Sequence, residues 1–446
     1  MTLSLAEIIA LAPDDASVKA ARGLVSPGMW PLLGANDAAV WGECQGSGSK
    51  PYQTQVDLAG PAFRCSCPSR KFPCKHGLAL LMLRTQDDAR FAGAAAPAWV
   101  GEWLASRGEK AQKKEAREAG KAAEPVDPLA TARREAQRWQ RIEGAAADLQ
   151  RFLADQLARG LGALDATTLA SWQTLAARMV DAQAPGLGAR LQDAAAGVRE
   201  GERWPERTLH RLGLLQLACD GFARRATLPD AVQADLRTVA GWPQDQAEVV
   251  AHGERVVDRW DVLGVATEER NVKLTERRVW LHGQRSGRRA WLLDHAFAGR
   301  GFEDAWIAGT AVDASLAFFP GASALRALLV ERGVPAPADA PAPSRASGGA
   351  GEWQAVAARI AASPWVGLHP LVLRDVRVGR DDEGLWLCAP GAAWPMTLAD
   401  VDTWRLLACT GGHAVDLAGE WDGFAFQPLT AWRPGVAAPA WIRETA

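Results

Sequence analysis

Apolar and polar positions in the first ninety residues follow two different periods. Residues 6–12 and 16–24 have the apolar spacing of short helices. Residues 38–45 and 52–58 then read as strands and flank a turn rich in Gly and Ser, which predicts a β-hairpin. The apolar run Gly77–Arg84 is made of Leu, Ala and Met and favours a helix. The pattern therefore predicts a strand–strand–helix unit.

The middle of the chain, from about 128 to 245, has a helical period. Apolar side chains repeat there every three or four residues, and such stripes usually form the buried face of a helix. The two clearest stripes are Leu169, Trp172, Leu175 and Met179, and Leu209, Leu212 and Leu215. We expect both stripes to lie in the core of an α-helical domain.

From about Glu254 the period changes towards two, which indicates strands. Residues 289–297 and 306–319 are predicted strands, and two apolar pairs flank the charged stretch 276–278. The last hundred residues combine a predicted helix at 352–361 with three strand-like runs. These runs are 371–378, 384–388 and 423–429. No convincing internal repeat is visible in the sequence.

Composition suggests two linkers. Residues 107–121 carry six basic and three acidic side chains with almost no large apolar ones, and 335–351 are rich in Pro, Ala, Ser and Gly. The predicted fold class is α+β and multidomain. The predicted units are 1–90 (strand–strand–helix module), 91–127 (charged linker), 128–245 (α-helical), 246–334 (β-rich) and 352–446 (α+β).

The sequence argues against several classes of protein. No apolar run is long enough to span a membrane, and Met1–Leu5 lacks the basic start of a secretory signal, so we expect a cytoplasmic protein. A net charge of −2 argues against a protein that coats nucleic acid over its whole surface. The P-loop, dinucleotide, H-E-x-x-H and G-x-S-x-G motifs are absent, and no catalytic residues stand out. We therefore expect a protein that is not an enzyme.

Three of the seven cysteines lie within ten residues and form the pattern C-x-C, six residues, C-x-H. Clustered cysteines in a cytosolic chain indicate metal or redox chemistry rather than disulfides. Alternate residues of a strand point to one side, so that Cys65 and Cys67 can reach the same ion. The six-residue loop then returns Cys74 and His76 to it. Three thiolates and an imidazole suit tetrahedral Zn²⁺, and four protein ligands indicate one structural ion.

The neighbouring charges support a structural zinc site, and the alternative interpretations fit the pattern less well. Arg64, Arg70, Lys71 and Lys75 surround the ligands, and we expect these cations to stabilise the thiolates. A thioredoxin-like redox pair needs C-x-x-C, which C-x-C does not supply. A catalytic zinc ion would leave one coordination position for water. Ordinary free cysteines would not show this order of ligands, prolines and cations.

Cys44 and the pair Cys409 and His413 are the other candidate metal ligands in the sequence. Cys44 lies on the predicted hairpin and is close enough in sequence to approach the zinc site, but four ligands are already present. Cys409 and His413 are three residues apart, and a metal site there needs two further ligands that the sequence does not show. We interpret them as a buried cysteine and a loop histidine.

The run from Cys65 to His76 resembles the SWIM zinc finger, whose pattern is C-x-C-x(n)-C-x-H in a strand–strand–helix unit. The resemblance covers about residues 35–90, including Cys67-Pro68 and Pro73-Cys74-Lys75-His76. The whole chain is similar to bacterial SWIM zinc-finger proteins of the type encoded beside a MoxR-type AAA+ ATPase and a von Willebrand factor A-domain protein. This resemblance implies binding to DNA or to proteins rather than catalysis.

The expected function is a non-catalytic zinc-binding adaptor, with the AAA+ ATPase and the A-domain protein as the partners that the resemblance implies. The alternative is nucleic-acid (DNA) binding by the basic face of the finger, because residues 50–86 carry six basic residues and one Asp, a net of +5. The candidate phosphate contacts are Arg64, Arg70, Lys71 and Lys75. A third interpretation, an enzyme in the C-terminal half without a recognised motif, stays open.

Overall fold

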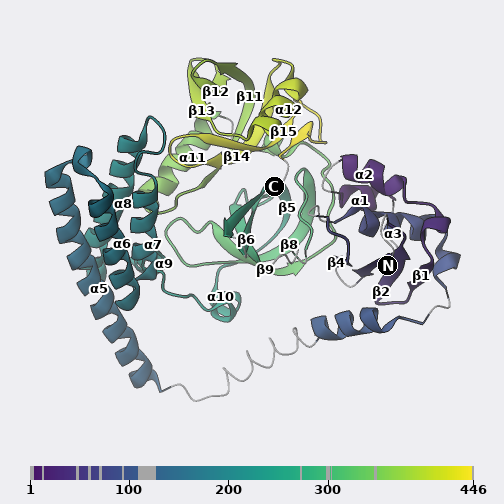
Figure 1. Ribbon diagram of the computed structural model, residues 1–446, viewed down its shortest axis with the longest axis horizontal. Helices are drawn as coiled ribbons and strands as arrows, with labels where there is room; N and C mark the ends of the chain where they lie inside the picture. The colour runs from purple at the N-terminus through teal and green to yellow at the C-terminus, as the bar shows by residue number, and fades with distance from the viewer. Residues whose placement is uncertain are drawn as a thin grey trace.

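A four-stranded antiparallel sheet and short helices form the N-terminal unit in the computed structural model of the chain (Figure 1). The structure describes residues 5–12, 15–46, 50–58, 62–69, 73–92, 95–108, 127–271, 274–297, 302, 304–345 and 349–443. The strands, in sheet order, are β1 (Leu32–Ala35), β2 (Ala39–Cys44), β3 (Tyr52–Asp57) and β4 (Ala62–Cys65). The helices are α1 (Leu5–Ala10), α2 (Asp15–Arg22) and α3 (Lys75–Gln86). The predicted strand–strand–helix unit is confirmed, and β1 and β4 extend it by a strand at each edge.

The N-terminal unit has a core of its own. Every residue of α3 from His76 to Leu83 is buried, as expected for a helix that is apolar on all sides. Val56 of β3 and Phe63 of β4 pack in the same core. Gly34 of β1 lies directly against the fully buried Trp41 ring, because a Cβ atom there would be 2.5 Å from the indole Nε1. The sheet therefore presents β4, which carries the first predicted zinc ligand, at one edge beside α3.

A helical unit follows and lies on the opposite side of the molecule from the N-terminal unit (Figure 1). Its helices are α5 (Pro128–Arg159), α6 (Ala166–Asp181), α7 (Pro185–Ala196), α8 (Trp204–Ala223) and α9 (Asp230–Ala240), followed by α10 (Gln246–His252). The predicted stripe of α6 is buried at Trp172, Leu175 and Met179. On α8, Leu212 and Leu215 are buried, but Leu209 is 51% exposed, so the prediction that Leu209 lies in the core is wrong.

The first half of the β-rich region is a closed barrel. Its strands are β5 (Arg255–Asn271), β6 (Leu274–Gly283), β7 (Arg289–Phe297), β8 (Thr310–Phe318) and β9 (Arg326–Arg332), with β10 (Ala336–Pro337) added to β8. β5, β6 and β7 are antiparallel neighbours, β8 pairs with both β5 and β9, and β9 pairs in parallel with β7. The five longer strands therefore close on themselves around an apolar interior.

A second barrel with the same connections occupies the C-terminal region. Helix α11 (Gly349–Ala362) precedes it, and α12 (Asp400–Thr410) lies between its third and fourth strands. Its strands are β11 (His369–Asp381), β12 (Gly384–Ala389), β13 (Ala392–Met396), β14 (Val415–Trp421) and β15 (Phe426–Trp432), with β16 (Trp441–Ile442) added to β15. β14 pairs with both β11 and β15, and β15 pairs in parallel with β13.

The two barrels therefore form a structural repeat that the sequence does not show. In each barrel a long first strand contains an irregularity. Its N-terminal part pairs with the fourth strand, and its C-terminal part pairs with the second strand. The order 1-2-3-5-4, with strands 3 and 5 parallel, is the connectivity of the five-stranded Greek-key barrel called the OB-fold. At the irregularity of β5, Gly264 admits Leu429 of the second barrel, since a Cβ atom there would lie 2.5 Å from the Leu429 Cβ.

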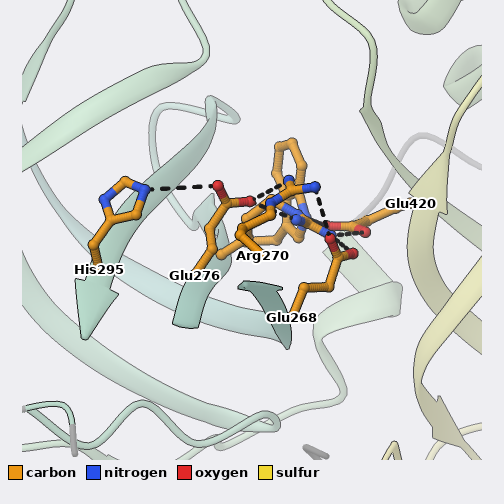
Figure 2. Close-up of polar contacts among 7 residues, drawn as sticks. Glu268, Arg270, Glu276, His295 and Glu420 are labelled. Atoms are coloured by element: carbon orange, nitrogen blue, oxygen red, sulfur yellow. Dashed lines mark hydrogen bonds and ion pairs between the residues drawn. The ribbon is translucent and has the colours of Figure 1, made fainter. Parts of the chain in front are cut away.

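A buried charge network joins the barrels (Figure 2). The charged stretch 276–278 lies within β6, where Arg278 is 2% exposed. Its guanidinium donates to Glu276 at 2.8 Å and, across the joint, to Glu420 of β14 at 2.8 Å. The Trp280 indole also donates to Glu420, at 2.6 Å. An arginine in a strand is buried here because carboxylates from both barrels satisfy its donors.

The described parts of the predicted linker 335–351 are residues 335–345 and 349–351. Ala336 and Pro337 pair with β8, and α11 starts at Gly349. Ala342 is 2% exposed and packs between the two barrels with Trp280 and Trp432. For these described residues the prediction of a linker from composition is wrong, because a small side chain, Ala342, packs where the two barrels meet. The predicted charged linker 91–127 is wrong in its described part, because residues 98–108 form a helix whose Val100 is 0% exposed and packs with Trp41. The charged segment 107–121 lies outside the described residues except for its first two. No helix in the described parts of the chain is long and apolar enough to cross a membrane.

Candidate metal centre

The four predicted ligands come together between the edge of the sheet and the start of α3. β4 ends at Cys65, and Cys67 lies in the bend that follows, so only one of the two is on a strand. Ser66 continues the pairing with β3, because its N–H donates to Gln53 O at 2.9 Å and its Oγ accepts from Gln53 N at 3.0 Å. Cys74 is the N-cap residue of α3, and His76 lies in the first turn.

The ligand atoms have the separation of a tetrahedral zinc site. The Sγ atoms of the three cysteines and a ring nitrogen of His76 all lie within 4.8 Å of one another. His76 Nδ1 is 3.7 Å from Cys65 Sγ and 4.0 Å from Cys74 Sγ. A tetrahedron with Zn–S bonds of about 2.3 Å has S···S edges of about 3.8 Å. The four side chains therefore fit one Zn²⁺, with His76 oriented to bind through Nδ1.

The pKa values of the three clustered thiols indicate that a cation is needed to deprotonate all of them. Hydrogen bonding to Cys67 raises the pKa of Cys65 to about 11, whereas hydrogen bonds from Cys65 and Cys74 lower the pKa of Cys67. The same contacts raise the pKa of Cys74 above its usual range. Without a bound cation, the three neighbouring thiols therefore do not all lose their protons. A divalent ion supplies the positive charge that allows all three to be thiolates.

Neighbouring residues hold the ligands in place. The Thr54 hydroxyl is 3.1 Å from Cys65 Sγ, and the two residues are register partners in the β3–β4 pair. The Tyr52 ring packs on the His76 ring with centroids 5.0 Å apart. A Cβ atom on Gly77 would lie 2.8 Å from the Phe63 ring, so glycine allows α3 to approach β4. Thr54 was not among the predicted site residues, because its partner strand β4 lies outside the predicted hairpin of 38–45 and 52–58.

The cations near the site are only partly described. Arg64 and Lys75 are exposed, whereas Arg70 and Lys71 lie outside the described residues. Cys44 of β2 is fully buried, and burial raises its pKa to about 11 against the opposing charge of Lys75. Cys44 is not one of the four clustered ligands.

No second group of metal ligands is present in the part of the chain that the structure describes. Cys409 lies inside α12, and its thiol donates to Ala440 O at 3.0 Å. His413 lies in the turn after that helix. Cys219 is buried in the helical unit, where burial raises its pKa to about 12.

Comparison with known families agrees with this geometry. Residues 52–84 match the SWIM zinc finger, and residues 137–240 match the SWIM-associated four-helix bundle domain. No curated protein and no solved structure matches the chain. The chain therefore contains a SWIM zinc-binding domain with a Cys₃His cluster and a SWIM-associated helical bundle, followed by the two barrels.

Proposed function

We propose that this chain is a non-catalytic zinc-containing adaptor, which docks protein partners through its helical bundle. The zinc ion holds the N-terminal unit together. The partners that we propose are a MoxR-type AAA+ ATPase and a von Willebrand factor A-domain protein, because proteins that the chain resembles are encoded beside them.

The observation that carries this proposal is an exposed apolar stripe on α8. Leu209 and Leu217 are 51% and 41% exposed, and the exposed Gly213 lies between them at helical spacing. Water-exposed leucines at i and i+8, on a helix whose opposite face is buried, are typical of a helix that binds a partner.

A neighbouring helix extends this surface. Gln150 of α5 donates a hydrogen bond to Asp220 near the end of α8, and Glu143 of α5 accepts one from Arg225 just after α8. The two helices therefore run antiparallel. That register brings the C-terminal end of α5, where Leu157 is 43% exposed, towards the N-terminal half of α8. The bundle thus offers apolar side chains from two helices to a partner.

The test uses the full chain and the two purified candidate partners in a co-sedimentation or pull-down assay. The wild type should bind at least one of them, and Leu209→Glu with Leu217→Glu should weaken binding by tenfold or more, because charged side chains would be placed in an apolar contact. Leu129→Glu is the matched control, since Leu129 is 71% exposed at the distant start of α5. Failure of both partners to bind, or equal binding by the double variant, would contradict the proposal.

A second candidate function, binding of nucleic acid by the zinc finger, is supported by the exposed Arg64 and Lys75 beside the site. Phosphate contacts release counterions, so binding would fall steeply with salt. Replacing Arg64, Arg70, Lys71 and Lys75 with Ala should abolish a mobility shift while zinc is retained. The absence of any shift with DNA or RNA at low salt would exclude this function.

A further inference from the structure

A pocket of about 610 Å³ lies where three parts of the molecule meet. The β6–β7 turn, the β8–β9 loop and α11 line it. The β8–β9 loop is tied to the helical bundle, because Ala322 N donates to Asp235 of α9 at 3.1 Å. Junctions between structural units are common positions for small-molecule sites, and this volume suits a small organic molecule.

The charged side chains of the pocket have an excess of positive charge. Three of them are arginines, Arg288, Arg289 and Arg359, against the single carboxylate of Glu352. Glu352 is already engaged, since Oε1 accepts from Arg289 at 2.7 Å and Oε2 accepts from Val372 N at 3.1 Å. The His282 Nδ1 atom contacts the Arg289 guanidinium, which can only donate hydrogen bonds.

Arg359 is the least satisfied of these cations. Among the described residues, its guanidinium has no carboxylate within ion-pair distance, and its Nη2 donates to Pro370 O at 3.0 Å. Its Nε is buried without a partner in the described part of the chain. Burial, with the nearby positive charge of Arg289, lowers the pKa of Arg359 to about 10. A guanidinium in such surroundings is stabilised by an anion.

The apolar part of the pocket lining restricts which kind of ligand can bind. The other lining side chains are mostly small and apolar: Ala322, Ala324, Leu325 and alanines of α11. Among the described residues that line the pocket, the only ring is the His282 imidazole. This surface suits a short aliphatic body and offers no platform for stacking a nucleobase. We propose that the pocket binds a small organic anion, whose phosphate or carboxylate contacts Arg359 and Arg288 while its body lies on the alanine wall.

The test uses the full chain with inorganic phosphate as the probe, and acetate as a second probe for the carboxylate arm, at constant ionic strength. Binding of phosphate is followed by ³¹P line broadening and by calorimetry. Arg359→Gln should weaken binding of the preferred anion by about 10- to 100-fold, because a charge-assisted hydrogen bond is lost. Arg288→Gln should have a smaller effect in the same direction, since Arg288 also pairs with Glu254.

The matched control is Arg259→Gln, an arginine on the neighbouring strand that pairs with the exposed Asp313 outside the pocket. This variant should bind the probe as the wild type does. Lys75→Ala tests whether the anion is held at the zinc finger instead. Absence of binding of both probes to the wild type, equal binding by the Arg359→Gln variant, or loss of binding only in Lys75→Ala would each overturn the proposal. The result is independent of partner docking by the bundle.

Discussion

Cys74 both binds the metal and starts α3, so its replacement is expected to have the largest effect of any single cysteine. Cys74→Ser should remove most of the zinc, because one thiolate is lost and the start of α3 loses its attachment to the ion. Zinc per chain is measured by mass spectrometry after dialysis. Cys219→Ser and Cys409→Ser, at positions outside the cluster, should keep one zinc. Full zinc occupancy in a variant with both Cys65→Ser and Cys67→Ser would refute the ligand assignment.

His369 gives a test of a buried titratable group. The side chain is 3% exposed, and burial, with the nearby Arg359, lowers its pKa from 6.5 to about 4. The unfolded chain therefore binds a proton below pH 6.5 that the folded chain does not, and stability falls as the pH falls from 6.5 towards 4. This group should cost the second barrel about 2 kcal/mol between pH 7 and pH 5.

The measurement is the opening free energy of the β11 amides by hydrogen exchange at these two pH values. His369→Gln does not titrate, and both proteins have the same zinc site, so the difference between them isolates His369. The variant should lose about 2 kcal/mol less than the wild type on acidification. An identical pH dependence in the two proteins would show that His369 is not a buried neutral group.

Individual site residues differ in how well the sequence predicts them. Cys65, Cys67, Cys74 and His76 lie within twelve residues, so their spacing alone indicates a tetrahedral site. Thr54 reaches Cys65 only through strand pairing, and Arg359 reaches Arg289 only through packing of α11 on the first barrel. Leu209 shows the converse, because an apolar stripe identifies a helix but does not show which of its leucines remains exposed.

At the level of strands, side-chain contacts from β6 to Glu420 of β14 cross the joint of the two barrels. Glu420 is fully buried and accepts hydrogen bonds from Arg278 and Trp280. Glu420→Gln removes the charge that balances a buried arginine across the joint, and it should destabilise the paired barrels by about 2–4 kcal/mol.

Asp313→Asn is the control, because Asp313 is 72% exposed in its pair with Arg259, and it should change stability by less than about 0.5 kcal/mol. Denaturant unfolding followed by Trp fluorescence compares the two, and equal midpoints for both variants would contradict a structural role for the network.

Elements with a strong local period were predicted well. The strand 289–297 coincides with β7, and the helix 352–361 lies within α11. β13 and β14 were not predicted. The parallel pair β7–β9 closes its barrel through residues about 35 apart, which no local pattern indicates. The repeat is invisible in the sequence because the barrels share connections and inward-facing positions rather than residue identities.

The molecule as a whole has separate cores, and this makes the effect of zinc removal local. The N-terminal unit packs around Val56, Phe63 and α3, whereas the bundle and barrels have cores of their own. Its contacts with the first barrel include the bridge between Ala62 and Asp304 and the side chain of Ile307. Small units of this kind depend on their metal for stability.

Chelation should therefore unfold the first ninety residues and leave the bundle and barrels folded. Hydrogen exchange of the full chain, with and without a chelator, measures this by segment. Peptides from α3 and β3 should lose protection, while those from α6 and β8 keep it. Loss of protection throughout the chain would show that the zinc-binding unit supports the whole molecule, and unchanged protection in α3 would show that zinc has no structural role.

Composition was a weaker guide to overall organisation than periodicity. Pro, Ala, Ser and Gly between 335 and 351 suggested an exposed linker, but small residues also suit a tight interface, and Ala342 lies between the barrels. The change from a helical period to a period of two near 254 did identify the start of the β-rich half, where β5 begins at Arg255.

The central claim is that a SWIM-type site in this chain holds one structural zinc ion through three sulfurs and one nitrogen. X-ray absorption at the zinc edge, on the full chain with its metal content determined, tests this most directly. The account predicts one zinc per chain, with three sulfur neighbours at about 2.3 Å and one nitrogen neighbour at about 2.0 Å. A first shell made only of nitrogen and oxygen, or a purified full-length chain that binds no zinc, would contradict it.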